Sequence, residues 1–548
     1  MSEVYDYIVV GAGIGGTVVA SRLHERDPNL KILILEAGQD ATNNPLVPTP
    51  LTAVLLQRTE VDWNYETVPQ KHLDGCRIPL PSGKAVGGSS VINWGVWTRG
   101  DAQDYDDWAA LVGDQRWSYQ GLLPYFRKTE HYHDGGKSVE THGYDGPVPT
   151  ASVSSSRRNY VFREPLKAAW AKNGVEYNPD GNSGSQLGLA EVVEARKDGS
   201  RVISSSVYPL TDVELLTDKL VSRIIIESQG TKKVATGVEL VDGTVYHAKQ
   251  EVILSAGALQ TPKILMLSGI GPAEQLQRHG INQIVDSPEV GKNHWDHFGL
   301  RTHWKLKNPG LGASLGSPEW KDPAFMMGNP IDWFVSIDAP SEELAAALVA
   351  DGVPAAEVKH HSLIKTPRCH SWSIMQYVGM SLANPVIPMD GSHVQTGVLC
   401  TLPTSRGTVT LASADPSAKP IVDPNYYSTE ADRYRIRQAA RLLLKVLTET
   451  SEGQDMVAHL ALPDGCADLS PNSVDEDIDG VAQRANMTIH HHAGTASMGK
   501  VVDNELKVKG VEQLRVVDAS VIPSPISCPI QVAVYALAEQ AVDMILKS

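Results

Sequence analysis

Three glycines near the N-terminus stand at a spacing suited to binding phosphate. Gly11, Gly13 and Gly16 form a G-x-G-x-x-G pattern between an apolar run, 7–10, and a predicted helix, 17–26. The first glycine allows a tight turn, the second lets the backbone approach a pyrophosphate, and the third allows the helix to pack closely on the strand. The pyrophosphate would then face a helix N-terminus, where free N–H groups favour an anion.

An acidic residue follows at the distance that a dinucleotide site requires. Glu36 ends a second apolar run, 31–35, and comes twenty residues after Gly16. A carboxylate at this point can accept hydrogen bonds from ribose hydroxyls. Strand, turn, helix, strand and acid in this order predict a βαβ unit of the Rossmann type. The pattern alone does not distinguish NAD from FAD.

Three adjacent histidines near the C-terminus, His490, His491 and His492, offer a base or a set of metal ligands. An imidazole has a pKa near neutrality and can remove a hydroxyl proton. In an extended segment alternate side chains point to opposite faces, so His490 and His492 would point away from His491. No further ligand stands at a metal-binding spacing, which favours a base and predicts no metal site.

Length and composition exclude several classes of protein. The chain has 548 residues and a formal net charge of −16. This length exceeds one compact core, so two or more domains are expected. An acidic surface repels a phosphate backbone, which argues against nucleic acid as a partner. No apolar run is long enough to cross a bilayer, so no membrane partner is expected.

Cysteine usage and the first residues predict a cytoplasmic location. Five scattered cysteines in so long a chain favour a reducing compartment over a disulfide framework. They are Cys76, Cys369, Cys400, Cys466 and Cys528. Residues 1–6 lead directly into a strand and leave no room for the basic and apolar regions of a signal peptide.

The pattern of elements changes along the chain. Residues 213–255 form apolar runs separated by short turns and predict a β-meander. From about 300 to 480, strands mix with helices such as 428–448, which indicates a second domain. The last part returns to a strand, 514–517, and a helix, 529–547.

Longer motifs follow the glycine turn in a fixed order. They are Gly83-Lys84-Ala85-Val86-Gly87-Gly88-Ser89-Ser90-Val91-Ile92-Asn93, Gly257-Ala258-Leu259-Gln260-Thr261-Pro262, Asp296-His297, His491-His492-Ala493-Gly494-Thr495 and Val517-Asp518-Ala519-Ser520. In residue type, order and spacing they resemble the glucose–methanol–choline (GMC) oxidoreductase family from end to end.

The resemblance implies a fold of mixed α/β and α+β class. It has a Rossmann-type FAD-binding domain and a discontinuous β-sheet-plus-helices substrate domain laid over the flavin ring. We assign residues 1–155, 200–305 and 482–548 to the FAD-binding domain. Residues 156–199 and 306–481 are assigned to the substrate-binding domain.

The resemblance also assigns residues to FAD from matching motif positions. The expected cofactor-binding residues are Gly11, Gly13, Ile14, Gly15, Gly16, Glu36, Ala37, Val86, Gly88, Asn93, Trp94, Gly95, Val96, Val221, Asp518, Ala519, Ile530 and Gln531. Val221 would contact adenine, and the amides of Ile530 and Gln531 would face the flavin pyrimidine ring. Some family members attach FAD through a histidine just before the position of Asn93. Here that residue is Ile92, which favours non-covalent FAD.

At the reacting end, the resemblance assigns the base to His491. The family usually places a second catalytic residue, His or Asn, eleven residues after the position of Asp518, and here that residue is Pro529. Proline has neither an acid–base group nor an N–H. It suits the first turn of a helix, with Ser527 or Cys528 at the cap.

Three explanations of Pro529 stay open. His491 could act alone, or the reaction could differ from alcohol oxidation. A group of the substrate domain could also substitute, and 359–361 and 369–370 contain candidates.

The expected function is an FAD-dependent oxidoreductase that takes a hydride from a small organic substrate, an alcohol, to flavin N5. Reduced flavin would pass its electrons to O2 or another acceptor. Cytosolic members of the family include enzymes of secondary metabolism, which suits this chain. The alternative is a redox-neutral cyclase or lyase in which FAD is largely structural, and a third possibility is a non-catalytic FAD-binding scaffold.

Overall fold

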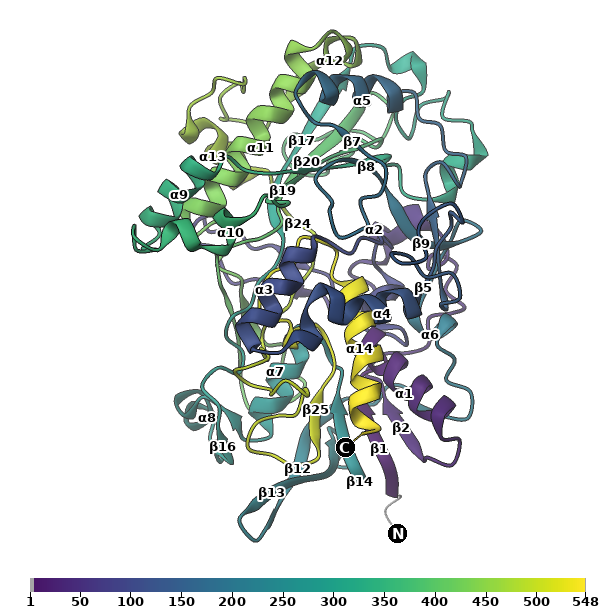
Figure 1. Ribbon diagram of the computed structural model, residues 1–548, viewed down its shortest axis with the longest axis vertical. Coiled ribbons are helices and arrows are strands. Elements are labelled where there is room, and N and C mark those ends of the chain that lie inside the picture. The colour runs from purple at the N-terminus through teal and green to yellow at the C-terminus, as the bar shows by residue number, and fades with distance from the viewer. Residues whose placement is uncertain (1–3, 548) are drawn as a thin grey trace.

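Two large β-sheets form the two ends of an elongated molecule (Figure 1). This computed structural model describes residues 4–547, so residues 1–3, part of the predicted N-terminal lead into the first strand, lie outside the described residues. A seven-stranded sheet occupies the lower half in Figure 1 and an eight-stranded sheet the upper half. The two ends of the described chain lie near each other at the bottom of the view.

The first sheet is built around the predicted βαβ unit. β1 (Val4–Val10) and β2 (Ile32–Leu35) pair in parallel, and α1 (Ile14–Arg26) connects them. β2 is apolar throughout because it is buried on both faces. The strand order is β11-β2-β1-β14-β13-β12, with β25 beside β14. The other strands are β11 (Glu214–Leu216), β12 (Val221–Gln229), β13 (Lys232–Leu240), β14 (Val245–Leu254) and β25 (Leu514–Val516).

The predicted meander holds for β12, β13 and β14, which pair in succession as antiparallel neighbours. β11 departs from it. Its residues pair in parallel with β2, from Glu214 opposite Leu33 to Leu216 opposite Leu35. The first run of the predicted meander therefore extends the Rossmann sheet at its other edge.

The second sheet has the order β23-β17-β20-β19-β18-β8-β7, with β24 beside β17. Its strands are β7 (Tyr177–Asn178), β8 (Gly188–Glu191), β17 (Phe298–Leu306), β18 (Trp333–Ile337), β19 (Ser371–Gln376), β20 (His393–Cys400), β23 (Val457–Ala461) and β24 (Asn486–Thr488). The predicted domain boundaries at 305 and 482 need correction, because β17 pairs with β20 along eight residues and β24 pairs with β17. Both strands belong to the second sheet.

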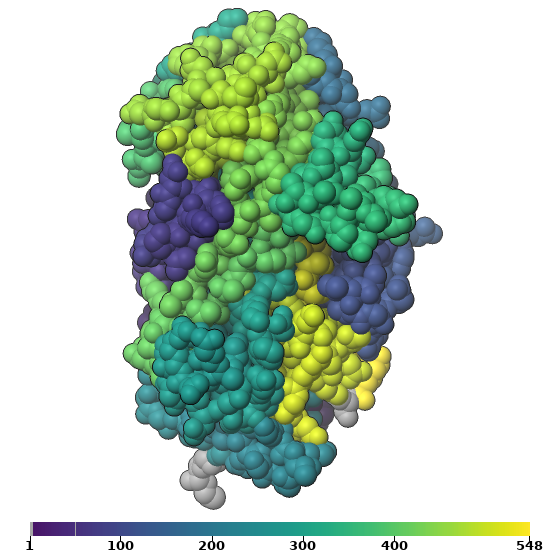
Figure 2. Space-filling view, turned by 90° about the vertical axis from the view of Figure 1, so that its left-hand side faces the viewer, coloured from purple at the N-terminus to yellow at the C-terminus, as the bar shows by residue number. Residues whose placement is uncertain are grey.

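Helices cover the sheets on their outer sides. α11 (Glu430–Glu449) packs across β19 and β20 of the second sheet. α9 (Ser341–Ala350) and α10 (Ser362–Lys365) lie in a lobe that protrudes at the upper right of Figure 2. The other helices of the upper half include α5 (Arg163–Lys172), α12 (Ser451–Met456) and α13 (Asp475–Arg484). In residues 4–547 no helix is long and apolar enough to cross a membrane.

The C-terminal helix, α14 (Gln531–Ile545), is almost entirely buried and packs against α1 and α4 (Tyr119–Thr129). It begins two residues later than predicted. Ile530 is its N-cap residue, and neither Ser527 nor Cys528 caps it. The predicted capping is wrong because the Ser527 hydroxyl is bound elsewhere, to the carboxylate of Asp104.

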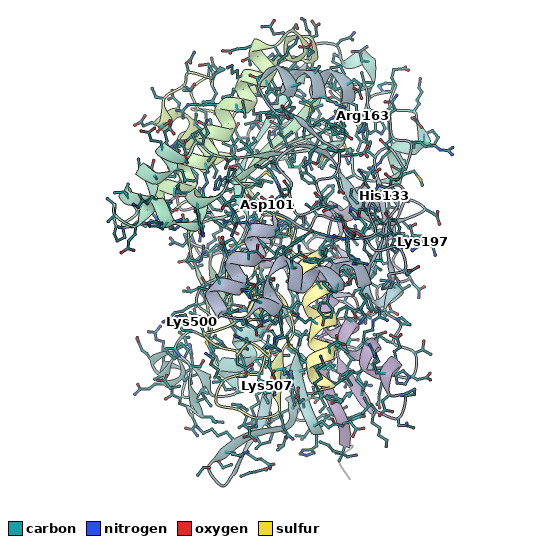
Figure 3. The ribbon with its side chains drawn as sticks, viewed as in Figure 1. Asp101, His133, Arg163, Lys197, Lys500 and Lys507 are labelled. Atoms are coloured by element: carbon teal, nitrogen blue, oxygen red, sulfur yellow. The ribbon has the colours of Figure 1, made fainter. Side chains whose placement is uncertain are left out.

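A buried carboxylate cluster joins the two halves. Asp101, labelled near the centre of Figure 3, precedes α3 (Ala102–Val112). Its carboxylate accepts the N–H of Cys369 at 2.7 Å and that of Gln186 at 3.0 Å. Burial and the nearby Asp104 raise the pKa of Asp101 to about 6.

Candidate active site

One cavity of about 500 Å³ is bordered by loops of the first sheet and by the inner face of the second. Every residue predicted to bind FAD or to act as the base borders this cavity, except Gly16 and Val86. A Cβ at Gly16 would lie 2.0 Å from the Gly11 carbonyl oxygen, so Gly16 lets α1 pack on the end of β1. Val86 is buried, and its N–H donates to the Gln39 carbonyl at 3.0 Å. For Gly16 and Val86 the structure shows packing and backbone contacts, and their predicted contact with FAD stays a prediction.

The glycine turn brings two loops together backbone to backbone. A Cβ at Gly88 would lie 2.6 Å from the Cα of Gly13, so a side chain there would force the loops apart. Gly13 is the N-cap residue of α1, and Ile14 and Gly15 begin the helix at the cavity wall. The free N–H groups of this first turn suit a phosphate.

Glu36 is a buried carboxylate at the same end of the cavity. It accepts the N–H groups of Ala12 and Gly38, each at 2.8 Å. Burial raises the pKa of Glu36, while these hydrogen bonds oppose that rise. A carboxylate has about four acceptor sites, so Glu36 can also accept from ribose hydroxyls. Ala37 and Val221 border the cavity beside it.

Asp518 fixes the start of a second helix at the cavity, α7 (Gly257–Leu267). It accepts the Gly257 N–H at 2.9 Å and the Thr261 hydroxyl at 2.6 Å. Its other oxygen accepts the Ser520 N–H at 2.8 Å, which shapes the turn that contains Ala519. Both carboxylates at this end are therefore already bonded to the protein.

The turn from Asn93 to Val96 is tied to the start of α14. Asn93 donates from Nδ2 to Gln531 Oε1 at 3.1 Å, and Gln531 donates from Nε2 to the Val96 carbonyl at 2.5 Å. The Gly95 N–H closes the turn on Asn93 Oδ1 at 2.9 Å. Trp94 borders the cavity in this turn. Asn93 and Gln531 are thus held in place by each other.

Three helices begin at this one cavity: α1, α7 and α14. Each is at least 11 residues long. Their N-termini carry the positive end of the helix dipole and first-turn N–H groups, of which that of Gly257 is already accepted by Asp518. The cavity therefore favours a ligand with negative charge near several of its walls.

His491 borders the far part of the cavity and is held by two contacts. Its Nδ1 lies 2.8 Å from Nδ1 of His297, and the two rings meet edge to face. Its backbone N–H donates to Asp296 Oδ1 at 2.6 Å. His297 and Asp296 directly precede β17, so the second sheet positions the predicted base.

Asp296 organises the neighbouring histidines as well. It accepts the hydroxyls of Thr488 and Tyr426, and its Oδ2 lies 3.4 Å from Nδ1 of His492. Burial alone would raise the pKa of Asp296, but His492 and these hydroxyls hold it below its ordinary value. His492 Nδ1 also lies 3.2 Å from His294 Nε2.

The expected alternation of side chains over 490–492 is interrupted. His490 has a φ of 61°, in the left-handed region, and all three histidines border the cavity. Burial lowers the pKa of each of them, and His297 lowers that of His491 further. The cluster is therefore neutral near neutral pH, which is the form a base requires.

The substrate-domain candidates for replacing the second catalytic residue do not reach the cavity. Lys359 and His360 are exposed, and His361 accepts the Leu363 N–H. Burial raises the pKa of Cys369. His370 Nδ1 accepts the Ala339 N–H at 3.0 Å and lies 2.9 Å from Asp338 Oδ1. None of these residues borders the cavity.

Pro529 does border the cavity, in a loop that hydrogen bonds at Ser527 hold in place. The Ser527 N–H donates to Asp104 Oδ2 at 2.7 Å, and Gln186 Nε2 donates to the Ser527 carbonyl at 2.7 Å. Cys528 is fully buried, and burial raises the pKa of its thiol. It therefore packs as a small apolar residue.

The second sheet forms the wall opposite the loops predicted to bind FAD. Its strands present a row of directly paired residues on one face: Arg301 of β17, Gly397 of β20, Ile374 of β19 and Phe334 of β18. One row away on the same face is Trp372, whose buried indole N–H has no hydrogen-bond partner in the described residues. His490 Nδ1 and His492 Nε2 are likewise buried without a partner there. Such groups are the ones that a bound ligand satisfies.

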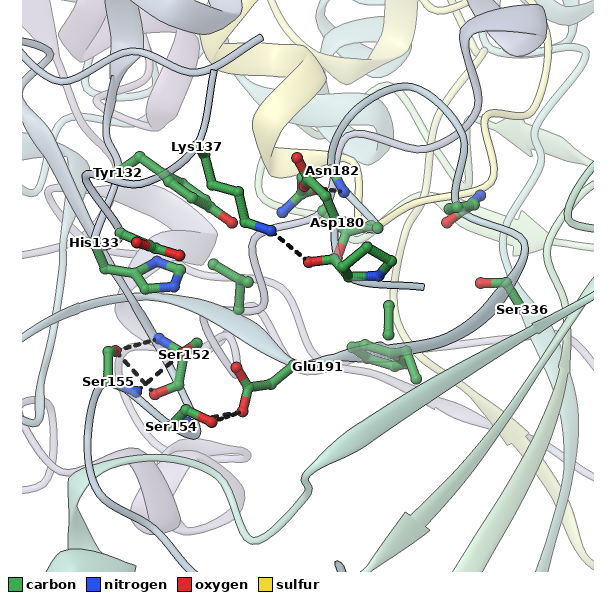
Figure 4. A pocket seen from close by; sticks show the side chains of 18 of the residues that line it. Tyr132, His133, Lys137, Ser152, Ser154, Ser155, Asp180, Asn182, Glu191 and Ser336 are labelled. Carbon is green, nitrogen blue, oxygen red and sulfur yellow. Dashed lines mark hydrogen bonds between the residues drawn. The ribbon is translucent and has the colours of Figure 1, made fainter. Parts of the chain in front are cut away.

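A second cavity of about 420 Å³ shares Phe334 and Trp372 with the first. Figure 4 shows its polar lining. Lys137 donates to the Pro179 carbonyl at 2.7 Å, and the Ser154 N–H donates to Glu191 at 2.9 Å. One of the shared residues, Trp372, has its ring centroid 6.2 Å from that of His297.

Residues 5–299 and 403–538 match the two family models described as GMC oxidoreductase. The chain belongs to the GMC oxidoreductase family.

Relatives of this GMC oxidoreductase match it over their full length. GMC-type oxidoreductase acuG of Aspergillus aculeatus is 38% identical, with 100% of both chains covered. Pyridoxine 4-oxidase of Microbacterium luteolum is 31% identical over 98% of both chains. A formate oxidase structure from Aspergillus oryzae superposes with a TM-score of 0.86 at 30% identity, covering 100% of this chain and 98% of that one.

The residues present fit the FAD that the GMC family implies. The Gly13–Gly88 contact leaves a bare backbone wall, and α1 and α7 offer N–H groups for a pyrophosphate. Glu36 is available to the ribose, and the start of α14 to the flavin ring. Ile92 borders the cavity and has no group that could form a covalent link.

The roles of Asp296, His297 and Trp372 were missed by sequence reasoning. Asp296-His297 was noticed only as a motif of the resemblance, and no pattern connects it with His491, 194 residues away. Trp372 carries no signal, since a tryptophan in a strand usually fills a core.

Proposed function

We propose that this GMC oxidoreductase is an FAD-dependent enzyme that oxidises an alcohol, with His491 as the base and FAD held without a covalent bond. Bound FAD supplies the acceptor for the hydride that leaves the carbinol carbon. The hydroxyl proton goes to His491, and the substrate becomes a carbonyl compound. The relative named pyridoxine 4-oxidase supports oxidation of a small organic molecule.

The observation that carries this proposal is the 2.8 Å contact between His297 Nδ1 and His491 Nδ1 at the cavity. Both rings are neutral, because burial lowers both pKa values. Only one of the two Nδ1 atoms can then carry a proton. With His491 as the donor, its Nε2 keeps a lone pair and can accept the hydroxyl proton. His297 is then a positioning residue that selects this tautomer.

The surroundings of His491 support the same role. Burial lowers its pKa and keeps it neutral before the reaction, and the nearby Asp296 stays ionised because His492 and two hydroxyls lower its pKa. Its negative charge stabilises the imidazolium that forms on His491. The indole N–H of Trp372, which has no partner in the described residues, borders the same cavity and is free to donate a hydrogen bond to the substrate oxygen.

Pro529 favours a second candidate, a redox-neutral cyclase or lyase of the same family. The side chain of Pro529 has no group that could donate to or accept from the substrate hydroxyl, and its backbone nitrogen carries no hydrogen. This alternative needs no hydride transfer, so flavin reduction distinguishes the two.

Substitution of His491 tests the assignment of the base. His491→Ala should lower kcat/KM by about 100-fold or more, since a positioned general base contributes about that much. FAD should stay bound, because the glycine turn is untouched. The matched control is Arg278→Gln on the exposed helix α8 (Ala273–Arg278), which should keep full activity. A His491→Ala enzyme with the turnover of the parent would disprove the assignment.

A further inference from the structure

Arg301 is a cation on the substrate side of the cavity. It is the fourth residue of β17, and it lies in the row that continues through Gly397 and Ile374 to Phe334. This row forms the inner face of the second sheet, opposite the loops that would hold FAD. Arg301 and Phe334 both border the cavity.

The guanidinium of Arg301 has no hydrogen-bond or carboxylate partner in residues 4–547. Other buried arginines differ: Arg99 pairs with Glu130 at 2.6 Å, and Arg158 pairs with Glu194 at 2.6 Å. Burial lowers the pKa of Arg301, and no nearby charge compensates. A half-buried guanidinium without a counter-ion is costly, and a bound anion would remove that cost.

The surroundings of Arg301 suit a carboxylate. One row further along the same face, Gln395 donates from Nε2 to Gln376 Oε1, and both amides border the cavity. The acidic residues that border the cavity, Glu36 and Asp518, are both bonded at the dinucleotide end. The substrate side therefore has a positive charge, amide groups and no bordering acid within the described residues.

We propose that Arg301 binds a carboxylate of the substrate, so that the natural substrate is an anionic alcohol. This inference rests on the proposed alcohol oxidation and adds the class of substrate. The planar guanidinium can donate two parallel hydrogen bonds to a carboxylate.

The position of Arg301 also sets the distance between the two ends of the substrate. Arg301 follows His297 by four residues, about 13 Å of extended chain. His297 contacts the base directly. This separation favours a substrate whose carboxylate and hydroxyl lie at opposite ends over a 2-hydroxy acid, in which they are on adjacent carbons.

Matched probes test this assignment on the FAD-loaded enzyme. 4-(Hydroxymethyl)benzoate and its neutral amide differ in charge and little in shape. The carboxylate should bind about tenfold or more tightly than the amide, as measured by calorimetric titration, because a hydrogen bond to a charged group is the stronger kind. Equal binding of the two probes, or no binding of the carboxylate, would overturn the proposal.

Variants assign the preference to Arg301. Arg301→Met should abolish the preference for the carboxylate and still oxidise the amide, whereas Arg301→Lys should keep part of it. Lys305→Met is the matched control, because Lys305 lies on the same strand outside the cavity and this variant should retain the preference.

A preference that persists in Arg301→Met contradicts the proposal. If Arg301→Met does not fold, Arg301→Lys and the two probes on the parent enzyme decide. Failure of the alcohol oxidation itself would appear differently, as no oxidation of either probe by any variant.

Discussion

His491 and His297 share a hydrogen bond in a place where neither ring is readily charged. Burial lowers the pKa of both rings, and His297 lowers the pKa of His491 further. Both rings therefore stay neutral near neutral pH, and their hydrogen bond fixes which nitrogen of each ring carries the hydrogen. The proton that His491 accepts during turnover then comes from the substrate hydroxyl, and above its lowered pKa the imidazole is already in the neutral form that can accept it.

This has a consequence for the pH profile of activity. An unperturbed histidine base would lose activity on acidification near pH 6.5, its ordinary pKa. Since the folded protein lowers the pKa of His491, its neutral form persists below that pH. We expect the acid limb of kcat/KM to lie clearly below pH 6.5, measured between about pH 4.5 and 9 with FAD content checked at each point. A limb at or above pH 6.5 would contradict the assigned environment.

At the scale of elements, α3 and the loop before α14 are clamped together. Asp104 pairs with Arg368 at 2.5 Å and accepts the Ser527 N–H at 2.7 Å, and both charged side chains are buried. Arg368 also pairs with Asp107 at 2.5 Å. This network fixes the loop that carries Pro529, so the cavity wall at that point is rigid.

Breaking the clamp should be costly. Asp104→Ala leaves the buried Arg368 with one carboxylate and removes the acceptor of Ser527. We expect a loss of about 3–5 kcal/mol in the free energy of unfolding, the usual cost of breaking a buried ion pair. Urea unfolding followed by fluorescence measures it. Glu274→Gln, which breaks an exposed pair on α8, should cost less than about 1 kcal/mol. A similar loss in both variants would contradict the clamp.

Helices and strands could be predicted where the sequence pattern that indicates them lies within a short stretch of the chain. The βαβ unit, the meander of β12 to β14 and α11 follow from apolar period and turns over short stretches. The start of α14 was misplaced, because Ser527 is bound by Asp104, 423 residues away. The assignment of β17 to the second sheet was missed for the same reason, since pairing with β20 is a long-range contact.

On the scale of the whole molecule, the cavity exists because the two sheets meet. The first sheet supplies the glycine turn, Glu36 and the starts of α1 and α7, whereas the second supplies Arg301, Trp372 and the approach to His297. Local motifs with recognisable spacing gave the prediction of the cofactor end. The substrate end is assembled from separate strands, so its Asp296–His297–His491 arrangement could be read only from the structure.

The most direct test of alcohol oxidation by this arrangement is anaerobic mixing of the FAD-loaded enzyme with the two hydroxymethyl probes, followed by absorbance. We expect the oxidised flavin band to bleach as the aldehyde forms, with equal amounts of flavin reduced and aldehyde produced. Bleaching should be at least about 100-fold slower in His491→Ala, with FAD still bound. Product formed while the flavin band stays unchanged would contradict the account and establish the redox-neutral alternative.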